Sequence, residues 1–464
     1  MDLTKKDRMY FIGIGGIGMS ALARYFIAGG FDVAGYDRTS TFLTDELKHE
    51  NCDIHFADNI RQIPGNFKNR KNKNETLVIY TPAIPENHSE LIYFRKHNYD
   101  IMKRSEVLGL ITKDTKGIAI AGTHGKTTVS AIIAHILKQS DLDCTAFLGG
   151  ISKNYNTNFL LGKSDFVVLE ADEFDRSFLQ LFPYLAVITS IDADHLDIYG
   201  DKKTLKESFK QFANQIREGG KLVIREGLDF NGFKRHELEQ YTYSLEGEAD
   251  FYVRNLAIKD GLYVFDIVTP GKTIEKVHFG FPGLMNVENA VAAAGVAWVL
   301  KVPPETIRKA LLYFNGVKRR FDFQIKTDNL IYIDDYAHHP KELKSCIHSV
   351  RELFPGKKIC GIFQPHLYSR TMYLAGDFAA SLDELDELIL LDIYPAREMP
   401  VKGVSSKIIF DKMKLQNKTI CKKNKLLDLI RNKNFEILIT LGAGDIDKLV
   451  DPIKSILLNK NHWA

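Results

Sequence analysis

Residues 117–129 read GIAIAGTHGKTTV, an apolar run followed by a glycine loop and the start of a second apolar pattern. The run at 117–121 predicts a buried strand, and apolar residues at 129, 132, 133, 136 and 137 have the spacing of an amphipathic helix. Between them, Gly125, Lys126 and Thr127 match the core of the Walker A motif, although Ile120 stands where that motif begins with glycine. This order of strand, loop and helix predicts a P-loop that binds a nucleotide.

The loop offers the groups that a nucleoside triphosphate requires. Backbone amides of such a loop cradle the phosphates, a lysine neutralises the terminal phosphates, and a hydroxyl group reaches Mg²⁺. Lys126 and Thr127 are expected to take the last two roles. The predicted ATP-binding residues of the loop are Gly122, Thr123, His124, Gly125, Lys126, Thr127 and Thr128.

Two further apolar runs, at 166–169 and 185–190, predict strands that lead into acidic residues. Ligands of α/β sheets bind beyond the carboxyl ends of the strands, so metal ligands are expected there. Glu170 is the first candidate. His195 is the second, with an ordinary surface histidine as the alternative. We expect Mg²⁺, or Mn²⁺ in its place; zinc is disfavoured because no second His or Cys stands nearby at ligand spacing.

A second glycine loop, GIGGIG, occupies residues 13–18. It links a predicted strand at 9–14 to a predicted helix at 19–28, and Asp37 ends the next predicted strand about twenty residues on. This is the context of a dinucleotide-binding fingerprint, in which glycines let backbone amides approach a diphosphate. We therefore expect a diphosphate here. NAD, FAD and a nucleotide sugar all remain open, and glycines that serve only a tight turn are the alternative.

Strands and helices are expected to alternate along much of the chain. A strand is predicted at 76–81, residues 222–280 read as β-rich and irregular, and a helix of small residues is expected at 290–299. Further strands are predicted at 330–333, 359–363, 388–391 and 437–441. Because 464 residues exceed what one hydrophobic core supports, we predict an α/β fold class with about three domains and a boundary near residue 320.

Composition excludes several classes of protein. A net charge of +3 is too small to indicate a nucleic-acid partner, and no apolar stretch is long enough to span a membrane. The basic start and apolar residues 9–23 imitate a signal peptide, but the glycines of the loop at 13–18 argue against it. Five scattered cysteines fit reduced thiols in the cytoplasm, which is the expected location.

Several motifs together resemble the Mur ligase family. They are the loop at 122–128, the pair Asn286 and Asn289, the segment at 319–321 and the segment at 334–340, in this order and over essentially the whole chain. The resemblance implies an N-terminal Rossmann-like domain for a UDP-sugar at 1–110 and a central P-loop ATPase-type domain with a mixed sheet at 111–319. It also implies a C-terminal Rossmann-like domain for the amino acid and for closure at 320–464.

The resemblance also assigns site residues. The ATP site would gain Asn286, Asn289, Arg320 and Asp335, and the catalytic residues would be Lys126, Glu170, His195, Arg320 and His338. The metal would be held by Thr127, Glu170 and His195. The UDP-sugar would contact Gly13, Gly15, Gly16, Ile17, Gly18, Asp37, Thr81 and Arg104. The amino acid would contact Tyr336, His338, His366 and Arg370.

Chemistry supports two of these assignments. The planar guanidinium of Arg370 suits a carboxylate, and the imidazole of His338 is a candidate base because histidine ordinarily titrates near pH 6.5. A substrate-positioning role for His338 and a surface ion pair for Arg370 remain the alternatives. Two residues depart from the family pattern: Met285 stands where relatives often have His, and Leu367 where many have Arg.

Within the family, residues 15–20, 364–370 and 442–445 are most similar to members that add L-alanine. The implied substrates are UDP-N-acetylmuramate, L-alanine and ATP, which would react through an acyl phosphate in peptidoglycan precursor synthesis. A ligase that recycles a cell-wall tripeptide onto the same UDP-sugar is the nearest alternative. An NAD(P)-dependent oxidoreductase would leave the P-loop unused, and a P-loop motor or switch would leave the loop at 13–18 unused.

Overall fold

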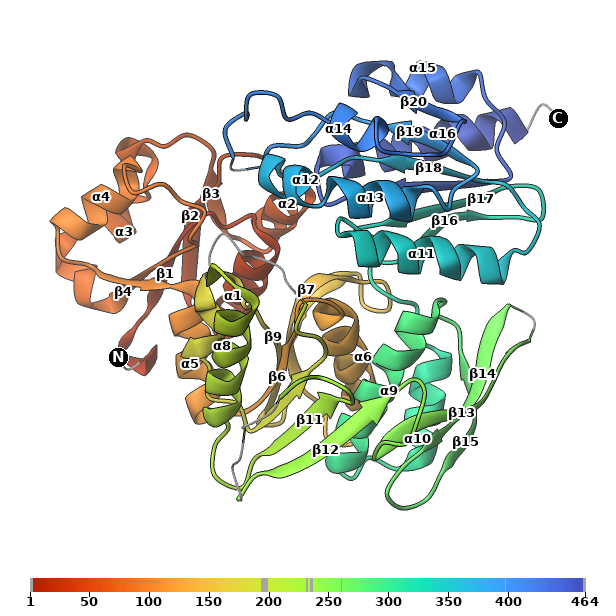
Figure 1. Cartoon of the computed structure of the whole chain (residues 1–464). Coiled ribbons are helices and arrows are strands. Elements are labelled where there is room, and N and C mark those ends of the chain that lie inside the picture. Colours follow the sequence, from red (N-terminus) through yellow and green to blue (C-terminus); the bar gives the residue numbers. More distant parts are fainter. Residues whose placement is uncertain are drawn as a thin grey trace. The chain divides into compact units, whose positions relative to one another are not determined.

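The computed structural model describes residues 3–192, 199–230, 233, 237–259, 261–396 and 398–461 (Figure 1). The chain forms two compact units. The first comprises Met1–Leu256, Phe265–His278 and Glu288–Phe314, and the second comprises Ala257–Val264, Phe279–Val287 and Asn315–Ala464. Along the described parts of the chain, no helix is long and apolar enough to cross a membrane.

The N-terminal sheet is parallel, with the order β3-β2-β1-β4-β5. Alternate side chains of β1 enter opposite cores: Met9 and Phe11 face one, Tyr10 the other. Both faces are therefore buried, as is usual for parallel sheets. The strands are β1 (Arg8–Ile12), β2 (Asp32–Tyr36), β3 (Asp53–His55), β4 (Thr76–Tyr80) and β5 (Asp100–Lys103). The helices are α1 (Ile17–Ala28), α2 (Phe42–His49), α3 (Gly65–Lys68), α4 (Ser89–Lys96) and α5 (Arg104–Asp114).

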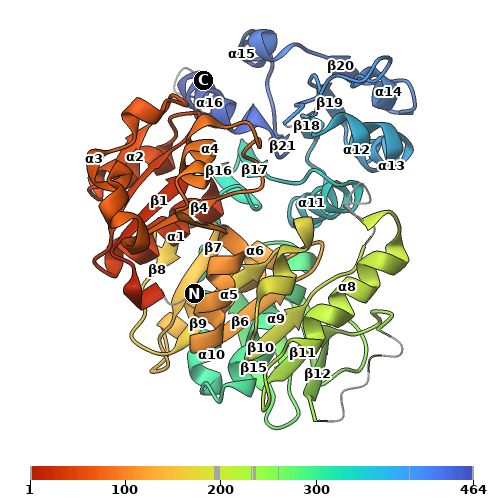
Figure 2. The same cartoon turned by 90° about the vertical axis from the view of Figure 1, so that its left-hand side faces the viewer.

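The central sheet has the order β15-β14-β13-β12-β11-β10-β6-β9-β7-β8. It is mixed, because β6 pairs in parallel with β9 and β10 whereas β7 and β8 are antiparallel. The helix α6 packs on β6, β7 and β9 (Figure 2). The strands are β6 (Lys116–Ala121), β7 (Thr145–Ser152), β8 (Thr157–Leu160), β9 (Phe166–Ala171), β10 (Leu185–Ile188), β11 (Lys221–Arg225), β12 (Glu239–Ser244), β13 (Phe251–Lys259), β14 (Leu262–Val268) and β15 (Ile274–Phe279). The helices are α6 (Lys126–Lys138), α8 (Lys202–Asn214), α9 (Leu284–Val299) and α10 (Pro304–Leu312).

The C-terminal sheet has the order β16-β17-β21-β18-β19-β20, and only its edge strand β16 runs antiparallel to its neighbour. Tyr332 and Leu438 on one face pack with Ile430 and Ile453 of α15 and α16. The helices α11 and α13 lie on the other face (Figure 1). The strands are β16 (Asp322–Lys326), β17 (Ile331–Asp335), β18 (Ile359–Phe363), β19 (Glu387–Leu390), β20 (Lys418–Ile420) and β21 (Ile437–Leu441). The helices are α11 (Pro340–Leu353), α12 (Tyr368–Tyr373), α13 (Ala375–Leu382), α14 (Lys407–Phe410), α15 (Leu426–Arg431) and α16 (Val450–Asn461).

Three sheets in this order confirm the predicted α/β fold class, including the mixed character of the central sheet. The predicted strands are present with small shifts at their ends. The largest difference is the start of α9, at Leu284 and not at residue 290. Asn286 and Asn289 lie three positions apart on this helix, as predicted. The exact domain boundaries at 110 and 319 stay a prediction.

Candidate active site

The P-loop connects β6 to α6, and its glycines are required by the backbone. Gly122 has φ 140° and Gly125 has φ 84°, both in the range that side chains disfavour. A Cβ on Gly122 would lie 2.0 Å from Oγ1 of Thr189, and one on Gly125 would lie 2.8 Å from Oδ1 of Asn289. The loop is therefore closely packed at the N-terminus of α6, where backbone amides and the helix dipole favour an anion.

The segment after β10 forms hydrogen bonds with the P-loop. Oγ of Ser190 accepts a hydrogen bond of 2.8 Å from the backbone amide of His124 and lies 3.0 Å from Oγ1 of Thr123. The backbone amide of Asp192 donates to Oγ1 of Thr123 at 3.0 Å. The side chains of Thr123 and Ser190 therefore fix the loop conformation, a supporting role that the sequence did not predict for Ser190.

The ammonium group of Lys126 is held by Glu173, a residue that no sequence motif predicted. Nζ donates to Oε2 of Glu173 at 2.6 Å, to Oε1 at 2.9 Å and to the backbone carbonyl of Gly122 at 2.7 Å. Burial alone would lower the pKa of Lys126, but the carboxylates of Glu173, Asp172 and Glu170 outweigh burial and raise it. Lys126 is therefore a cation in a strongly acidic environment.

Glu170, near the end of β9, lies beside the first turn of α6. Its Oε1 accepts a hydrogen bond of 2.8 Å from the backbone amide of Gly149 and lies 3.4 Å from Oγ of Ser130. Ser130 in turn donates to the backbone carbonyl of Thr127 at 3.1 Å. A Cβ on Gly149 would lie 2.3 Å from Oε1 of Glu170, so a glycine is needed for this close approach.

The donor chemistry of Thr127 and Glu170 fits Mg²⁺, which prefers oxygen ligands and keeps several waters when it binds phosphates. Within the described residues no group of three or more His, Cys, Asp or Glu side chains could hold a metal ion. His195, the other predicted ligand, lies outside the described residues. The assignment of the metal to Thr127, Glu170 and His195 stays a prediction.

The glycine loop at 13–18 is surrounded by three of the residues assigned to the UDP-sugar. Oδ2 of Asp37 accepts a hydrogen bond of 2.8 Å from the backbone amide of Gly15. A Cβ on Gly18 would lie 2.3 Å from Nη1 of Arg104, and one on Gly13 would lie 2.7 Å from Cγ2 of Thr81. The structure thus brings Asp37, Thr81 and Arg104 together at this loop, where Arg104 supplies a positive charge.

The two asparagines of α9 have different neighbours. Asn289 lies beside Gly125 of the P-loop, as the close approach of its Oδ1 shows. Nδ2 of Asn286 donates a hydrogen bond of 2.5 Å to the backbone carbonyl of Pro282. Asn289 is thus placed at the phosphate loop, whereas Asn286 contacts the segment that leads into α9.

In the second unit, the predicted acid and arginine lie together at the end of β17. Desolvation raises the pKa of Asp335 to about 6, although Arg320 and the backbone amides of Phe321 and Ala337 oppose this rise. The guanidinium of Arg320 lies 4.8 Å from the centre of the Tyr336 ring, a cation–π contact. Asp335, Arg320 and Tyr336 therefore form one cluster.

The predicted amino-acid residues continue from this cluster. The rings of Tyr336 and His338 lie 5.3 Å apart, and those of His338 and His366 lie 5.9 Å apart. Nη1 of Arg370, on α12, lies 3.4 Å from Nδ1 of His366, whose ring stacks on Tyr394 at 5.8 Å. The four predicted residues thus form one chain of contacts, and Tyr394 is a neighbour that the sequence did not predict.

Gln364 and Asp445 support the same region. Nε2 of Gln364 donates to Oδ1 of Asp445 at 2.9 Å, and Oε1 accepts from the backbone amide of Ile446 at 3.0 Å. Hydrogen bonds from Lys423 and Gln364 outweigh desolvation and lower the pKa of Asp445. The contact joins the segments at 364–370 and 442–445, whose proximity the sequence did not reveal.

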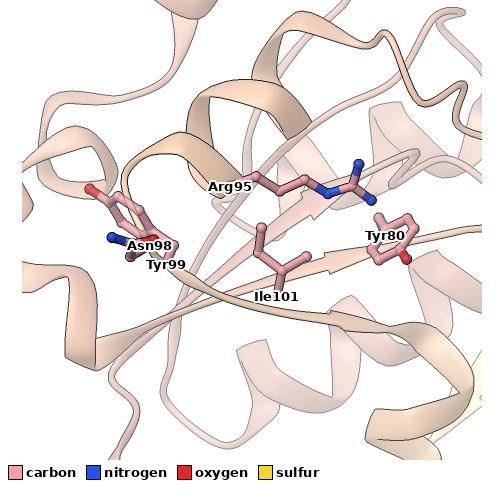
Figure 3. Close-up of a pocket in the computed structure, with 5 residues that line it drawn as sticks. All are labelled: Tyr80, Arg95, Asn98, Tyr99 and Ile101. Atoms are coloured by element: carbon pink, nitrogen blue, oxygen red, sulfur yellow. The ribbon is translucent and has the colours of Figure 1, made fainter.

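A hollow lies elsewhere, on β4, α4 and β5. It is lined by Tyr80, Arg95, Asn98, Tyr99 and Ile101. Figure 3 shows Tyr80 on the right, Asn98 and Tyr99 on the left, and Arg95 and Ile101 between them. None of the predicted site residues lines this hollow.

Three models of the same family match the chain in order. They are described as the Mur ligase family catalytic domain at residues 8–116, the Mur ligase middle domain at 120–297 and the Mur ligase glutamate ligase domain at 319–443.

Relatives match over nearly the full length. A UDP-N-acetylmuramate–L-alanine ligase of Parabacteroides distasonis is 55% identical over 458 residues, which is 98% of either chain. One of Porphyromonas gingivalis is 51% identical, covering 97% of this chain and 99% of the relative. The crystal structure of a UDP-N-acetylmuramate-alanine ligase from Thermotoga maritima has a TM-score of 0.79 at 26% identity, covering 98% of this chain and 99% of that chain.

Proposed function

Because the chain belongs to the Mur ligase family, we propose that it joins L-alanine to the carboxylate of UDP-N-acetylmuramate in an ATP-dependent reaction. The observation that carries the proposal is the similarity over nearly the full length to ligases of this name, at 55% and 51% identity. The product would be a precursor of peptidoglycan. The consumption of ATP and the buried, unpaired cysteines fit a cytoplasmic location.

The two glycine loops support this proposal over the rivals from other classes. An oxidoreductase would have no use for the P-loop with Lys126, and a P-loop motor would have none for the loop at 13–18 with Arg104. The tripeptide-recycling ligase is disfavoured for another reason. The relatives at 55% and 51% identity bear the name of the alanine-adding ligase, whereas the likeness to a murein peptide ligase from Psychrobacter arcticus, at 20% identity and a TM-score of 0.71, shows only a common fold.

The reaction needs ATP because oxide is a poor leaving group. A carboxylate oxygen of the muramyl group attacks the γ-phosphorus of ATP, the bond to ADP breaks, and an acyl phosphate forms. The alanine amine then attacks the carbonyl carbon, a C–N bond forms, and inorganic phosphate leaves. The amine loses a proton to a base in this second step.

For the first step, phosphoryl transfer depends mainly on positioning and charge neutralisation. Lys126 and the amides of the P-loop would hold the phosphates, and Thr127 and Glu170 would hold Mg²⁺ together with His195. When bound, Mg²⁺ supplies positive charge that offsets the charge developing on the transferred phosphoryl group. Arg104 would bind the diphosphate of the UDP-sugar.

For the second step, the cluster in the second unit offers a carboxylate anchor and a base. The guanidinium of Arg370 would bind the carboxylate of alanine, next to His366 and Tyr336. Nδ1 of His338 lies 3.0 Å from the backbone carbonyl of Tyr336. Nδ1 also lies 3.3 Å from Oε2 of Glu342. Because both neighbouring oxygens accept, Nδ1 carries a hydrogen, and the imidazole of His338 would serve as the base.

The test is phosphate release measured for each pairing of sugar and amino acid. We expect release that requires both UDP-N-acetylmuramate and L-alanine. Release from ATP alone would favour a motor or switch. Faster release with the cell-wall tripeptide than with alanine would favour the recycling ligase.

A further inference from the structure

The ammonium group of Lys126 has three N–H donors, and the protein occupies all of them. The acceptors are both carboxylate oxygens of Glu173, at 2.6 and 2.9 Å, and the backbone carbonyl of Gly122 at 2.7 Å. A lysine has three donors and no acceptor, so none is left for a phosphate. The group expected to neutralise the terminal phosphates of ATP is therefore already bound to a protein anion.

The carboxylate of Glu173 is buried, with 1% of its side chain exposed. Its backbone carbonyl accepts a hydrogen bond of 2.6 Å from Oη of Tyr199. Asp175 and Arg176, which follow directly, have φ values of 54° and 52°, an unusual pair of left-handed residues without glycine. The turn that presents Glu173 to Lys126 is thus an unfavourable backbone conformation that the surrounding structure maintains.

Backbone amides of Arg176 and Phe178 close this turn by donating to the carbonyls of Glu173 and Asp172. Side chains add further contacts. The guanidinium of Arg176 lies 5.6 Å from the centre of the Tyr199 ring. Oδ2 of Asp175 accepts a hydrogen bond of 2.8 Å from Nζ of Lys103, which lies at the end of β5. The turn that follows Glu173 is therefore fixed by contacts with Lys103 and Tyr199.

The buried ion pair between Lys126 and Glu173 has two consequences. Removal of one partner leaves an uncompensated buried charge, which destabilises the fold. In addition, a phosphate that needs Lys126 must compete with Glu173 for the same ammonium group.

This inference rests on the proposed function. We propose that Glu173 is a positioning residue that holds Lys126 in the nucleotide-free enzyme and yields it to the phosphates when ATP binds. The affinity for ATP then reflects an exchange of one anion for another at Lys126. Glu173 stabilises the empty site and weakens nucleotide binding by the same contact.

The variant Glu173→Gln tests this exchange. Its amide oxygen can still accept a hydrogen bond from Lys126, but the negative charge is lost. We expect the dissociation constant for ATP, measured by calorimetry with Mg²⁺ and without the other substrates, to fall about tenfold. We also expect a lower melting temperature without nucleotide and a larger increase on addition of ATP than in the wild type.

Asp143→Asn is the matched control. Asp143 pairs with Lys138 at the other end of α6, and its φ of 48° suits asparagine. This variant also loses a carboxylate–lysine pair of the same helix, but it does not touch Lys126. We expect its melting temperature to fall equally with and without ATP, and its dissociation constant for ATP to stay unchanged.

The proposal is overturned if Glu173→Gln binds ATP as weakly as the wild type or more weakly, or if it behaves like Asp143→Asn. Should Glu173→Gln fail to fold, Glu173→Asp is the second variant, because it keeps the charge on a side chain too short to make the same contact with Lys126. If Glu173→Asp does not bind ATP more tightly than the wild type, the proposal is wrong. If the wild-type protein does not bind ATP at all, the proposed function itself is contradicted. This result is distinct from the outcomes for the Glu173 variants, which test only the exchange at Lys126.

Discussion

Oδ2 of Asp335 accepts a hydrogen bond of 2.7 Å from the backbone amide of Phe321, so that the carboxylate closes the turn between Arg320 and β16. Oδ1 accepts a second bond of 2.7 Å from the backbone amide of Ala337. Desolvation nevertheless raises the pKa of Asp335 to about 6. The Asp335 carboxylate therefore supports the cluster with Arg320 and Tyr336, although its desolvated surroundings disfavour the charged form.

This rise in pKa predicts how Asp335 contributes to stability. A group whose pKa is raised by folding stabilises the protein below its unfolded pKa, 3.8 for this carboxyl, and this contribution is lost as pH rises through about 6. Asp335→Asn keeps an uncharged side chain at all pH values. We expect the unfolding free energy of the wild type, relative to that of the variant, to fall by on the order of 1–2 kcal/mol from pH 4 to pH 7. The value is set below that of the full pKa shift because solvent screens a side chain that is only partly buried. Urea denaturation at both pH values measures it, and a pH-independent difference would contradict the shift.

Lys126→Ala should abolish ligation and leave the binding of UDP-N-acetylmuramate nearly unchanged, because the two nucleotides are assigned to loops on different sheets. Loss of such an electrostatic group typically lowers the rate by about 10²-fold or more. Since the substitution leaves Glu173 without its partner, the double variant Lys126→Ala with Glu173→Gln is the control for stability. Calorimetry would count against the division of roles if affinity for the UDP-sugar collapsed together with activity.

Glu170→Gln should raise the Mg²⁺ concentration that gives half the maximal rate, by about tenfold or more, because an amide is a poorer ligand than a carboxylate. The amide oxygen can still accept from the backbone amide of Gly149, so the local fold should persist. His195→Ala should act in the same direction. A titration of the rate with Mg²⁺ measures both variants, and an unchanged metal dependence would remove the residue from the metal site.

The sequence predicted those parts of the fold and site that depend on local order. The P-loop could be predicted because the strand, Gly125, Lys126, Thr127 and the apolar face of α6 are contiguous. The same holds for the glycine loop at 13–18 and for strands whose apolar runs are unbroken. The predicted start of α9 was late, because the apolar and polar residues from Leu284 onward lack the run of alanines that marks its later turns.

Residues that act through tertiary contacts could not be predicted from the local sequence. Glu173 reaches Lys126 across 47 positions of the chain, and Gln364 reaches Asp445 across 81. Nothing in the local pattern of either pair reveals its partner. The signal available for Glu173 was its place in an acidic segment directly after a buried strand, the same signal that predicted Glu170.

Arg370→Ala should raise the KM for L-alanine at least about tenfold, or about 1.4 kcal/mol, with little change in the KM for ATP. A free amino acid must be held by its carboxylate while its amine attacks, and the planar guanidinium suits that group. Nη1 of Arg370 lies 3.4 Å from Nδ1 of His366, so the anchor adjoins the chain of contacts that leads to His338. Arg370→Lys keeps the charge but not the paired N–H donors, and it should lie between wild type and alanine variant. Steady-state kinetics with one substrate varied at a time decides it, and equal increases in KM for ATP and alanine would assign Arg370 to domain closure instead.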